Sequence, residues 1–183
     1  MSVLNNEPHG LKRFRARLQN QNNIIWVEIG VHKARSPAHV FARFNIEKMY
    51  LIDPYTALSY CSRFETQPRQ DQHKKTAHEA LEAHKEKCIW LEDFSENVVD
   101  TFEDNSVDVV FIDGDHSYEA VLRDLKNYYP KVRPGGIIAG DDYHEEEVQA
   151  AVKEFQKNFD PPFLLGVEGG NRGLFWFTKK EGK

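Results

Sequence analysis

The chain has 183 residues, of which 40% are hydrophobic and 29% are charged, and its formal net charge at pH 7 is −5. This length and composition are those of one globular domain with a hydrophobic core. The negative charge, together with the lack of a basic stripe in the sequence, argues against nucleic acid as a partner.

The sequence gives no indication of a membrane or of secretion. No apolar run approaches the length of a membrane span, and the first 23 residues lack the apolar core of a signal peptide. The two cysteines, Cys61 and Cys88, follow no metal-ligand spacing, and two reduced thiols are typical of a cytosolic chain. We therefore expect a cytoplasmic protein.

Apolar runs alternate with helix-prone segments along most of the chain. The runs predict strands over Ile24–Gly30, Lys48–Asp53, Cys88–Leu91, Val107–Asp113 and Ile137–Gly140. Helices are expected from a cap at Ser36, over Thr66–Glu86, over Phe94–Phe102, from Ser117, and over Glu145–Phe159. Two last apolar runs, Phe163–Val167 and Gly173–Phe177, are separated by EGGNR and predict a hairpin.

Alternation of this kind predicts a parallel sheet with right-handed crossovers and helices on both faces. We expect a doubly wound, Rossmann-like α/β fold of about seven strands that ends in an antiparallel hairpin. A single domain should span residues 24–183, and residues 1–23 should form an arm or a helix. The pattern is least informative from Pro54 to about Gln72.

In such sheets, ligands bind at the carboxyl ends of the strands. The first strand ends in VEIGVHKARS, where Gly30 permits a sharp turn whose amides can face a ligand. His32 and Ala34 stand where a glycine-rich fingerprint would have glycines, which disfavours a bound pyrophosphate. A purely structural turn explains this motif about equally well.

The second and third strands also end in acids. Asp53 lies 23 residues after Gly30, and an acid at about that distance commonly accepts the ribose hydroxyls of an adenosine ligand; a helix cap is the alternative. The third strand runs into the acids Glu92 and Asp93. The flanking aromatic residues, Trp90 and Phe94, could bound an adenine there, although core packing is their commoner role.

Three aspartates follow the fourth and fifth strands. Asp113 and the pair Asp141 and Asp142 are separated by 28 residues, which is one crossover. If the two strands are neighbours, their ends lie about 5 Å apart, and three carboxylates would repel one another strongly without a cation. Because hard oxygen ligands suit magnesium, calcium or manganese, we favour a divalent metal over three separate caps.

The stretch FIDGDHSYEAVLRDLKNYYPKVRPGGIIAGDDY resembles the fourth and fifth motifs of class I S-adenosylmethionine-dependent methyltransferases. It is most similar to the small metal-dependent O-methyltransferases of the macrocin and catechol types. VEIGVHKARS and YLIDPY are similar to the first and second motifs, so the resemblance spans about Ile24 to Phe177. The chain departs at Ala34, where relatives usually carry glycine, and it has little sequence before Ile24 and no large insertion from which to build a substrate cap.

The resemblance implies S-adenosylmethionine as the cofactor and a Mg²⁺ or similar divalent ion. It implies these site residues: Glu28, Gly30 and Ser36 near the methionine part; Asp53 at the ribose; Glu92, Asp93 and Phe94 near the adenine; and Asp113, Asp141 and Asp142 as metal ligands, with Asp113 next to the cofactor.

Methyl transfer from a sulfonium needs a deprotonated oxygen in line with the methyl group, and a metal can lower the pKa of an acceptor hydroxyl. His116, just after Asp113, is the candidate general base, with a helix-cap role as the alternative, and His144 is a weaker candidate. We expect a small hydroxyl-bearing acceptor. The final hairpin and the N-terminal arm are candidate contacts for a homodimer.

Other classes stay open. A nicotinamide-binding oxidoreductase would also use a first-strand turn and Asp53, but it does not explain the three aspartates. A metal-dependent phosphohydrolase would place its strongest acids after the first strand, where this chain has Glu28 and Gly30. The third alternative is a non-catalytic module that binds an adenosine cofactor.

Overall fold

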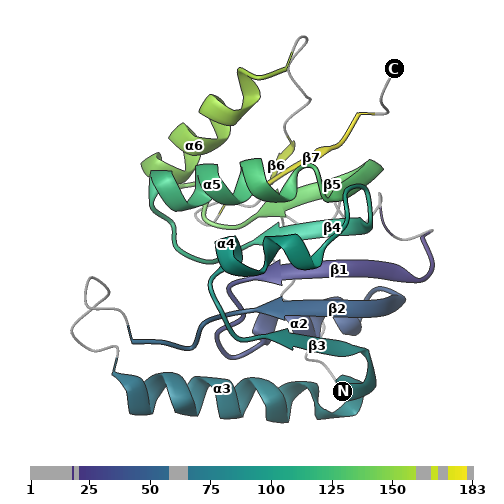
Figure 1. The fold of residues 1–183 in the computed structure, drawn as a ribbon, viewed down its shortest axis with the longest axis vertical. Coiled ribbons are helices and arrows are strands. Elements are labelled where there is room, and N and C mark those ends of the chain that lie inside the picture. Colours follow the sequence, from purple (N-terminus) through teal and green to yellow (C-terminus); the bar gives the residue numbers. More distant parts are fainter. Residues whose placement is uncertain (1–17, 19–20, 58–65, 160–165, 169–172, 181–183) are drawn as a thin grey trace.

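The structure is a computed structural model, and it describes residue 18 and residues 21–57, 66–159, 166–168 and 173–180 (Figure 1). Within these residues lies a seven-stranded sheet of order β3-β2-β1-β4-β5-β7-β6. The strands are β1 Ile24–Ile29, β2 Ile46–Ile52, β3 Cys88–Leu91, β4 Val107–Ile112, β5 Val132–Gly140, β6 Gly166–Glu168 and β7 Leu174–Thr178.

The strand directions confirm the predicted fold class. β1 to β5 are parallel to one another, whereas β7 pairs antiparallel with both β5 and β6. The chain moves outward from β1 to β3 and then returns to the other side of β1 with β4. The strand order therefore reverses between β1 and β4, and ligands bind at this kind of position in doubly wound sheets.

Helices cover both faces of the sheet. The α-helices are α2 Arg35–Phe41, α3 Gln67–Leu81, α4 Ser95–Val98, α5 Tyr118–Tyr128 and α6 Glu146–Gln156, with 3-10 turns over 82–87 and 99–101. In Figure 1, α4 and α5 lie in front of the sheet and α2 lies behind it. Ring stacking of His78 on Trp90 joins α3 to the edge strand β3.

Two hydrophobic cores follow from this layering. Val27 and Val110 belong to the core shared with α5 and α6, while Trp26 and Val109 belong to the core on the other face. Successive residues of one strand thus enter opposite cores, which explains why these strands read as unbroken apolar runs.

Several boundaries differ from the sequence-based expectation. α2 begins at Arg35, and its N-cap is Ala34 in a left-handed conformation, so Ser36 lies inside the helix and is not its cap. The helix expected over Thr66–Glu86 is confirmed at its start, since Thr66 is the N-cap of α3, but the α-helix ends at Leu81 and residues 82–87 form a 3-10 turn. β5 begins at Val132 and not at Ile137: Val132 already pairs with Val107, and the β4–β5 register shifts between this pair and Val109 with Ile137.

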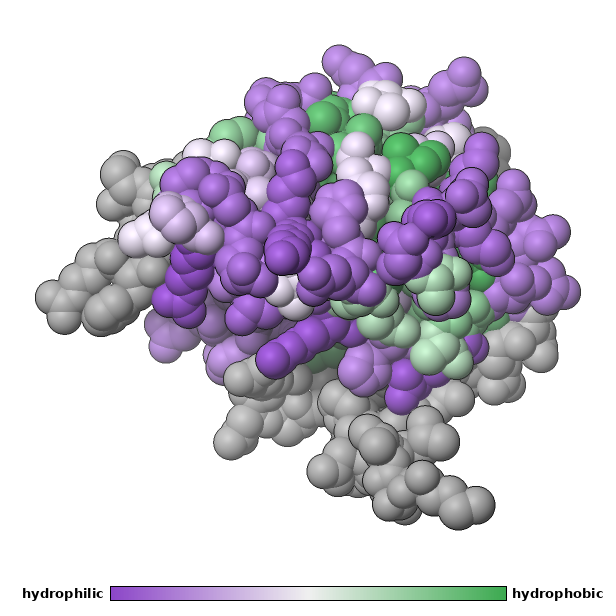
Figure 2. All heavy atoms as spheres, turned by 90° about the horizontal axis from the view of Figure 1, so that it is seen from below, coloured by the Kyte–Doolittle hydropathy of each residue, from purple (hydrophilic) through white to green (hydrophobic). Residues whose placement is uncertain are grey.

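Some expectations fall outside the described residues. They are most of the arm over 1–23, Cys61, and the first part of the strand expected over Phe163–Val167. Across the residues that the structure does cover, we find no helix that is both long and apolar enough to cross a membrane. The face seen from below in Figure 2 is mainly hydrophilic, in keeping with the polar sequence of α3.

Candidate functional site

A cavity of about 1210 Å³ opens at the carboxyl ends of the parallel strands. Its walls include Gly30 after β1, Asp53 after β2 and Asp113 after β4, together with the segments that lead into α4, α5 and α6. This is the edge of the sheet where the strand order reverses, so the cavity lies where the sequence predicted a ligand.

The floor of the cavity depends on the absence of a side chain at Gly30. This residue has φ +85°, and a Cβ built on it would lie 2.0 Å from the carbonyl oxygen of Asp113. The Gly30 amide donates to the Ile52 carbonyl at 2.9 Å, and the Asp113 amide donates to the Ile29 carbonyl at 2.7 Å. Only glycine therefore lets β1 turn while the ends of β1, β2 and β4 stay in contact.

Asp53 holds the turn that follows β1. Its Oδ2 accepts hydrogen bonds from the amides of Val31 at 3.0 Å and His32 at 2.8 Å, and its Oδ1 accepts from the Tyr55 amide at 2.9 Å. His32 and Ala34 have φ of 50° and 55°, a left-handed conformation that costs a non-glycine residue about 1 kcal/mol. Asp53 thus stabilises a turn in which His32 and Ala34 occupy backbone conformations that favour glycine. Asp53 also lines the cavity.

Glu28 lies beneath this turn, away from the cavity wall. It is fully buried, and burial raises the pKa of its carboxyl to about 8, with the charges of Asp113 and Asp141 adding to the effect. The Trp26 indole donates to Oε2 at 2.6 Å, whereas Oε1 has no hydrogen-bond partner in the part of the chain that the structure covers. Glu28 therefore holds a proton at neutral pH, although Ser36 lies close enough to favour the ionised form.

The turn between β3 and α4 contributes Asp93, Phe94 and Ser95 to the cavity. Asp93 Oδ1 accepts from the Phe94 amide at 2.7 Å and from Asn97 at 2.8 Å, and these hydrogen bonds lower the pKa of the carboxyl. Glu92 points elsewhere and pairs with Lys74. Trp90 does not line the cavity but stacks on His78, so for this residue the packing alternative is the one observed.

Two of the three aspartates meet a histidine at the ends of β4 and β5. Asp113, His116 and Asp142 each place a ligand atom within 4.8 Å of the other two. His116 Nε2 lies 3.3 Å from Asp142 Oδ2 and 3.8 Å from Asp113 Oδ1, and its Nδ1 lies 3.4 Å from Glu145 Oε1. Asp141 stands outside this group, and its Oδ1 accepts the Asp142 amide at 2.9 Å.

A second group of potential ligand atoms adjoins the first. Asp142, His144 and Glu145 also place ligand atoms within 4.8 Å of one another, and Asp142 is common to both groups. All three residues belong to the turn between β5 and α6. We note this group without assigning it a role, because exposed acidic turns occur in many proteins without any ion.

The surrounding carboxylates control the proton on His116. The carboxylates of Asp113, Asp142 and Glu145, of which Asp113 has the largest effect, raise the pKa of the imidazole to about 9, although burial acts in the opposite direction. Without a cation, His116 is therefore protonated at neutral pH and acts as a donor. A bound dication would oppose the field of the same carboxylates and favour the neutral imidazole.

Charge is distributed unevenly over the cavity wall. Among the described residues that line the cavity, ten are aspartate or glutamate, and the one lysine or arginine in this set, Arg123, pairs with Glu96 at 3.3 Å. Such a wall repels phosphate groups and attracts cations.

Ser95 and Asp124 are among the cavity-lining residues that the sequence did not single out. Asp124 lies on α5 three residues after Val121 and four before Tyr128, in the middle of the apolar face of that helix. A charged residue within an apolar stripe is the signal that could have identified it.

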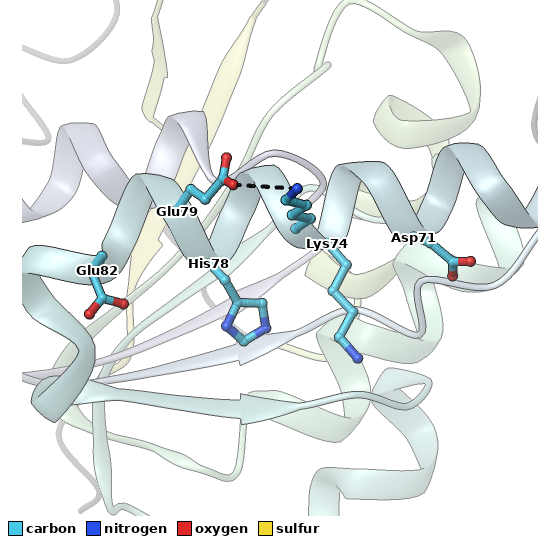
Figure 3. A pocket seen from close by; sticks show the side chains of 6 residues that line it. Asp71, Lys74, His78, Glu79 and Glu82 are labelled. Carbon is cyan, nitrogen blue, oxygen red and sulfur yellow. Dashed lines mark ion pairs between the residues drawn. The ribbon is translucent and has the colours of Figure 1, made fainter.

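A second hollow, of about 680 Å³, lies along α3 and away from the strand ends. Figure 3 shows Asp71, Lys74, His78 and Glu79 on this helix and Glu82 at its C-cap, and the dashed line marks the 4.0 Å pair of Lys75 with Glu79. Charges of both signs at a polar helix surface are the expected composition of a solvated face, so we assign no function to this hollow.

Residues 27–143 match the model of a family described as a methyltransferase domain. Over 125 residues the chain is 29% identical to an uncharacterized protein of Acanthamoeba polyphaga mimivirus, an alignment that covers 68% of this chain and 54% of the viral protein. The chain thus spans about half the length of that relative.

Solved structures show the same fold. A protein of Streptococcus mutans, described as a candidate methyltransferase and solved in complex with SAH, has a TM-score of 0.68 at 14% identity, with 94% of this chain and 98% of that chain covered. An rRNA methylase from Streptococcus thermophilus has a TM-score of 0.68 at 14% identity, with 98% and 100% covered.

Proposed function

This chain belongs to the methyltransferase domain family, and we propose that it transfers a methyl group from S-adenosylmethionine to a hydroxyl oxygen of a small molecule, assisted by a divalent cation. One observation carries the proposal. A single cavity contains both the Gly30 turn with Asp53, which suits a nucleoside cofactor, and Asp113 with His116, which suits activation of a hydroxyl group.

The residues present fit the cofactor. Asp53 offers carboxylate oxygens at the ribose position, and the turn at Gly30 lets a ligand approach the backbone closely. Phe94 provides an aromatic wall next to the acid of the β3–α4 turn. When bound, the cofactor supplies an electrophilic methyl group on a positively charged sulfur, and an acidic wall favours that charge.

The donor set also fits a divalent cation. We propose Asp113, Asp141 and Asp142 as its ligands, and the geometry adds His116 as a competing candidate, because His116 and not Asp141 lies within 4.8 Å of both other acids. Two carboxylates with an imidazole suit manganese or zinc as well as magnesium. Such an ion supplies Lewis acidity that lowers the pKa of an acceptor hydroxyl.

His116 is the proposed general base for the acceptor hydroxyl. It lines the cavity, and its Nε2 faces Asp113 and Asp142. Its raised pKa means that this role depends on a cation to offset the carboxylates. The base and the ion are therefore one linked proposal.

The acidic wall also narrows the proposed acceptor. Phosphorylated molecules and nucleic-acid strands would meet ten carboxylates with one arginine among them, so we propose a neutral or cationic small molecule. The similarity to an rRNA methylase is a similarity of fold, so it gives no reason to propose RNA as the acceptor against the negative charge of the cavity wall.

A thermal-shift comparison tests the proposal. S-adenosylmethionine and S-adenosylhomocysteine should each raise the melting midpoint, because a ligand that binds only the folded state stabilises it. NAD should have no effect, and Asp53→Ala should reduce the shift at the same ligand concentration. A midpoint that rises with NAD and not with S-adenosylhomocysteine would favour the oxidoreductase alternative and overturn the proposal.

A further inference from the structure

The segment over 54–57 follows Asp53 and forms the part of the cavity wall beside it. Pro54 and Thr56 line the cavity, and the Thr56 hydroxyl donates to the Pro54 carbonyl at 3.0 Å. Between them, Tyr55 is buried and has φ 45°, a left-handed conformation that is unfavourable for a residue other than glycine. The shape of this wall therefore depends on the contacts that hold Tyr55.

The Tyr55 side chain makes this conformation still less favourable. Its hydroxyl is buried and has no hydrogen-bond partner among the residues that the structure describes. A buried hydroxyl without a partner costs free energy, and a strained backbone persists only where the surrounding contacts hold it. Because strain of this kind concentrates at functional sites and ligand clamps, the contacts around Tyr55 indicate a role in ligand binding.

Gln67, the first residue of α3, supplies contacts of this kind. Its Nε2 donates to the Tyr55 carbonyl at 3.0 Å, and its Oε1 accepts from the Ala57 amide at 3.2 Å. Nε2 also donates to Asp71 Oδ1 at 2.8 Å, so three partners agree on which end of the Gln67 amide is nitrogen. The side-chain amide thus pairs with one carbonyl and one amide of the segment, as a neighbouring β-strand would.

The backbone of Tyr55 is therefore held from two sides. Asp53 Oδ1 accepts its amide at 2.9 Å, and Gln67 donates to its carbonyl. Gln67 itself does not line the cavity, so its effect on a ligand passes through the segment that it holds. A side-chain amide offers a donor and an acceptor together, whereas glutamate offers acceptors alone and methionine is at most a weak acceptor.

We propose that Gln67 is a positioning residue for cofactor binding, which fixes the segment over 54–57 so that Asp53 and the adjoining wall are in place to receive the ribose. The inference rests on the proposed function, since it assumes an adenosine cofactor in this cavity. Gln67 acts before the ligand arrives, by keeping the binding-competent conformation populated. A protein in which that conformation is only partly populated loses affinity in proportion to the lost population.

Calorimetry with S-adenosylhomocysteine tests the inference. Gln67→Met keeps the length of the side chain but removes the donor and the strong acceptor. Affinity should fall about fivefold or more, because two hydrogen bonds that hold the segment are lost. Gln72→Met is the matched control, since it makes the same change at an exposed position of α3 whose side chain bonds to Thr76 of the same helix. The control should stay within about twofold of wild type.

A double variant separates positioning from a general loss of structure. Asp53→Ala removes both the proposed ribose acceptor and the second contact that holds Tyr55. If Gln67 acts through this arrangement, adding Gln67→Met to Asp53→Ala should change affinity by less than about twofold, because residues that act as one unit are not additive. Two effects that multiply would show that Gln67 acts independently of Asp53, and the inference would be overturned.

Gln67→Glu gives a second measurement if Gln67→Met does not fold. It keeps an acceptor for the Ala57 amide but places a carboxylate oxygen against the Tyr55 carbonyl, so it should weaken binding as well. If wild-type protein binds S-adenosylhomocysteine and the Gln67 variants bind it equally well, the assignment of Gln67 is wrong while the proposed function stands. If wild-type protein does not bind S-adenosylhomocysteine, both are overturned.

Discussion

Asp124→Asn should stabilise the protein at pH 7 but not at pH 4. The carboxyl is buried, and burial raises its pKa from 3.8 to about 6. The unfolded chain loses this proton near pH 4, whereas the folded protein holds it until about pH 6. Because the folded state is the better proton binder, its stability falls as the pH rises from about 4 to about 6 and then stays lowered. The difference between the two pKa values corresponds to about 3 kcal/mol at pH 7.

Asparagine keeps the shape of the side chain and can accept the Ser95 hydroxyl, but it carries no charge at any pH. The difference in unfolding free energy between variant and wild type should therefore be near zero at pH 4 and about 3 kcal/mol at pH 7. Urea denaturation followed by circular dichroism at pH 4, 5, 6 and 7 measures this difference directly. A difference that is the same at all four pH values would refute the reasoning.

Asp93→Asn provides a control of opposite sign. Hydrogen bonds from Asn97 and the Phe94 amide lower the pKa of Asp93, so its ionised form contributes stability above the unfolded pKa and loses it as the pH falls through the folded value. This variant should be less stable than wild type at pH 7 and should approach wild type at low pH. Opposite slopes from two acids at one end of the cavity would exclude a general charge effect.

Four further predictions concern the turn and the acid–histidine group. Asp53→Ala should weaken binding of S-adenosylhomocysteine at least about tenfold by calorimetry, and unchanged affinity would contradict the ribose assignment. The variant should also have a lower melting temperature, because three backbone amides lose their acceptor. Gly30→Ala should lose about 3 kcal/mol or more in urea denaturation, because its Cβ would collide with the backbone of Asp113, and wild-type stability would show that the turn can relax. His116→Gln should lower the rate of methyl transfer about a hundredfold in a radiolabel assay with cofactor affinity intact, and a rate within a few-fold of wild type would leave His116 a structural residue. EDTA should abolish activity and Mg²⁺ should restore it, and full activity in EDTA would contradict a metal-assisted reaction. Asp142→Asn should bind Mn²⁺ more weakly than wild type by calorimetry.

Periodicity along the chain was enough to predict the fold class. Burial of a strand on both faces requires an apolar residue at nearly every position, as in Val107–Ile112, and this signal needs no knowledge of neighbouring strands. The antiparallel pairing of β6 with β7 was likewise readable from two apolar runs around a glycine-rich turn.

Local backbone strain shifted the boundaries that periodicity could not place. The turn after β1 runs through left-handed residues at His32 and Ala34, so α2 begins before the Ser36–Pro37 signal that indicated its start. Such a conformation is held by hydrogen bonds to Asp53, which lies 21 residues after His32. The sequence pattern around the start of α2 therefore gives no sign of the residue that holds this turn.

The sequence by itself determined that acids end β2, β4 and β5 and that these ends share one edge of a parallel sheet, because strand direction follows from alternation with helices. Only the tertiary structure decided which side chains meet. In the structure, His116 lies next to Asp113 and Asp142, whereas the Asp141 carboxylate accepts the amide of Asp142. Asp124 is buried and accepts the Ser95 hydroxyl. The physical reason is that the spacing of buried residues is a property of a single helix or strand and can be read from its sequence. A contact between two side chains depends also on the register of two elements and on the path of the turns that connect them.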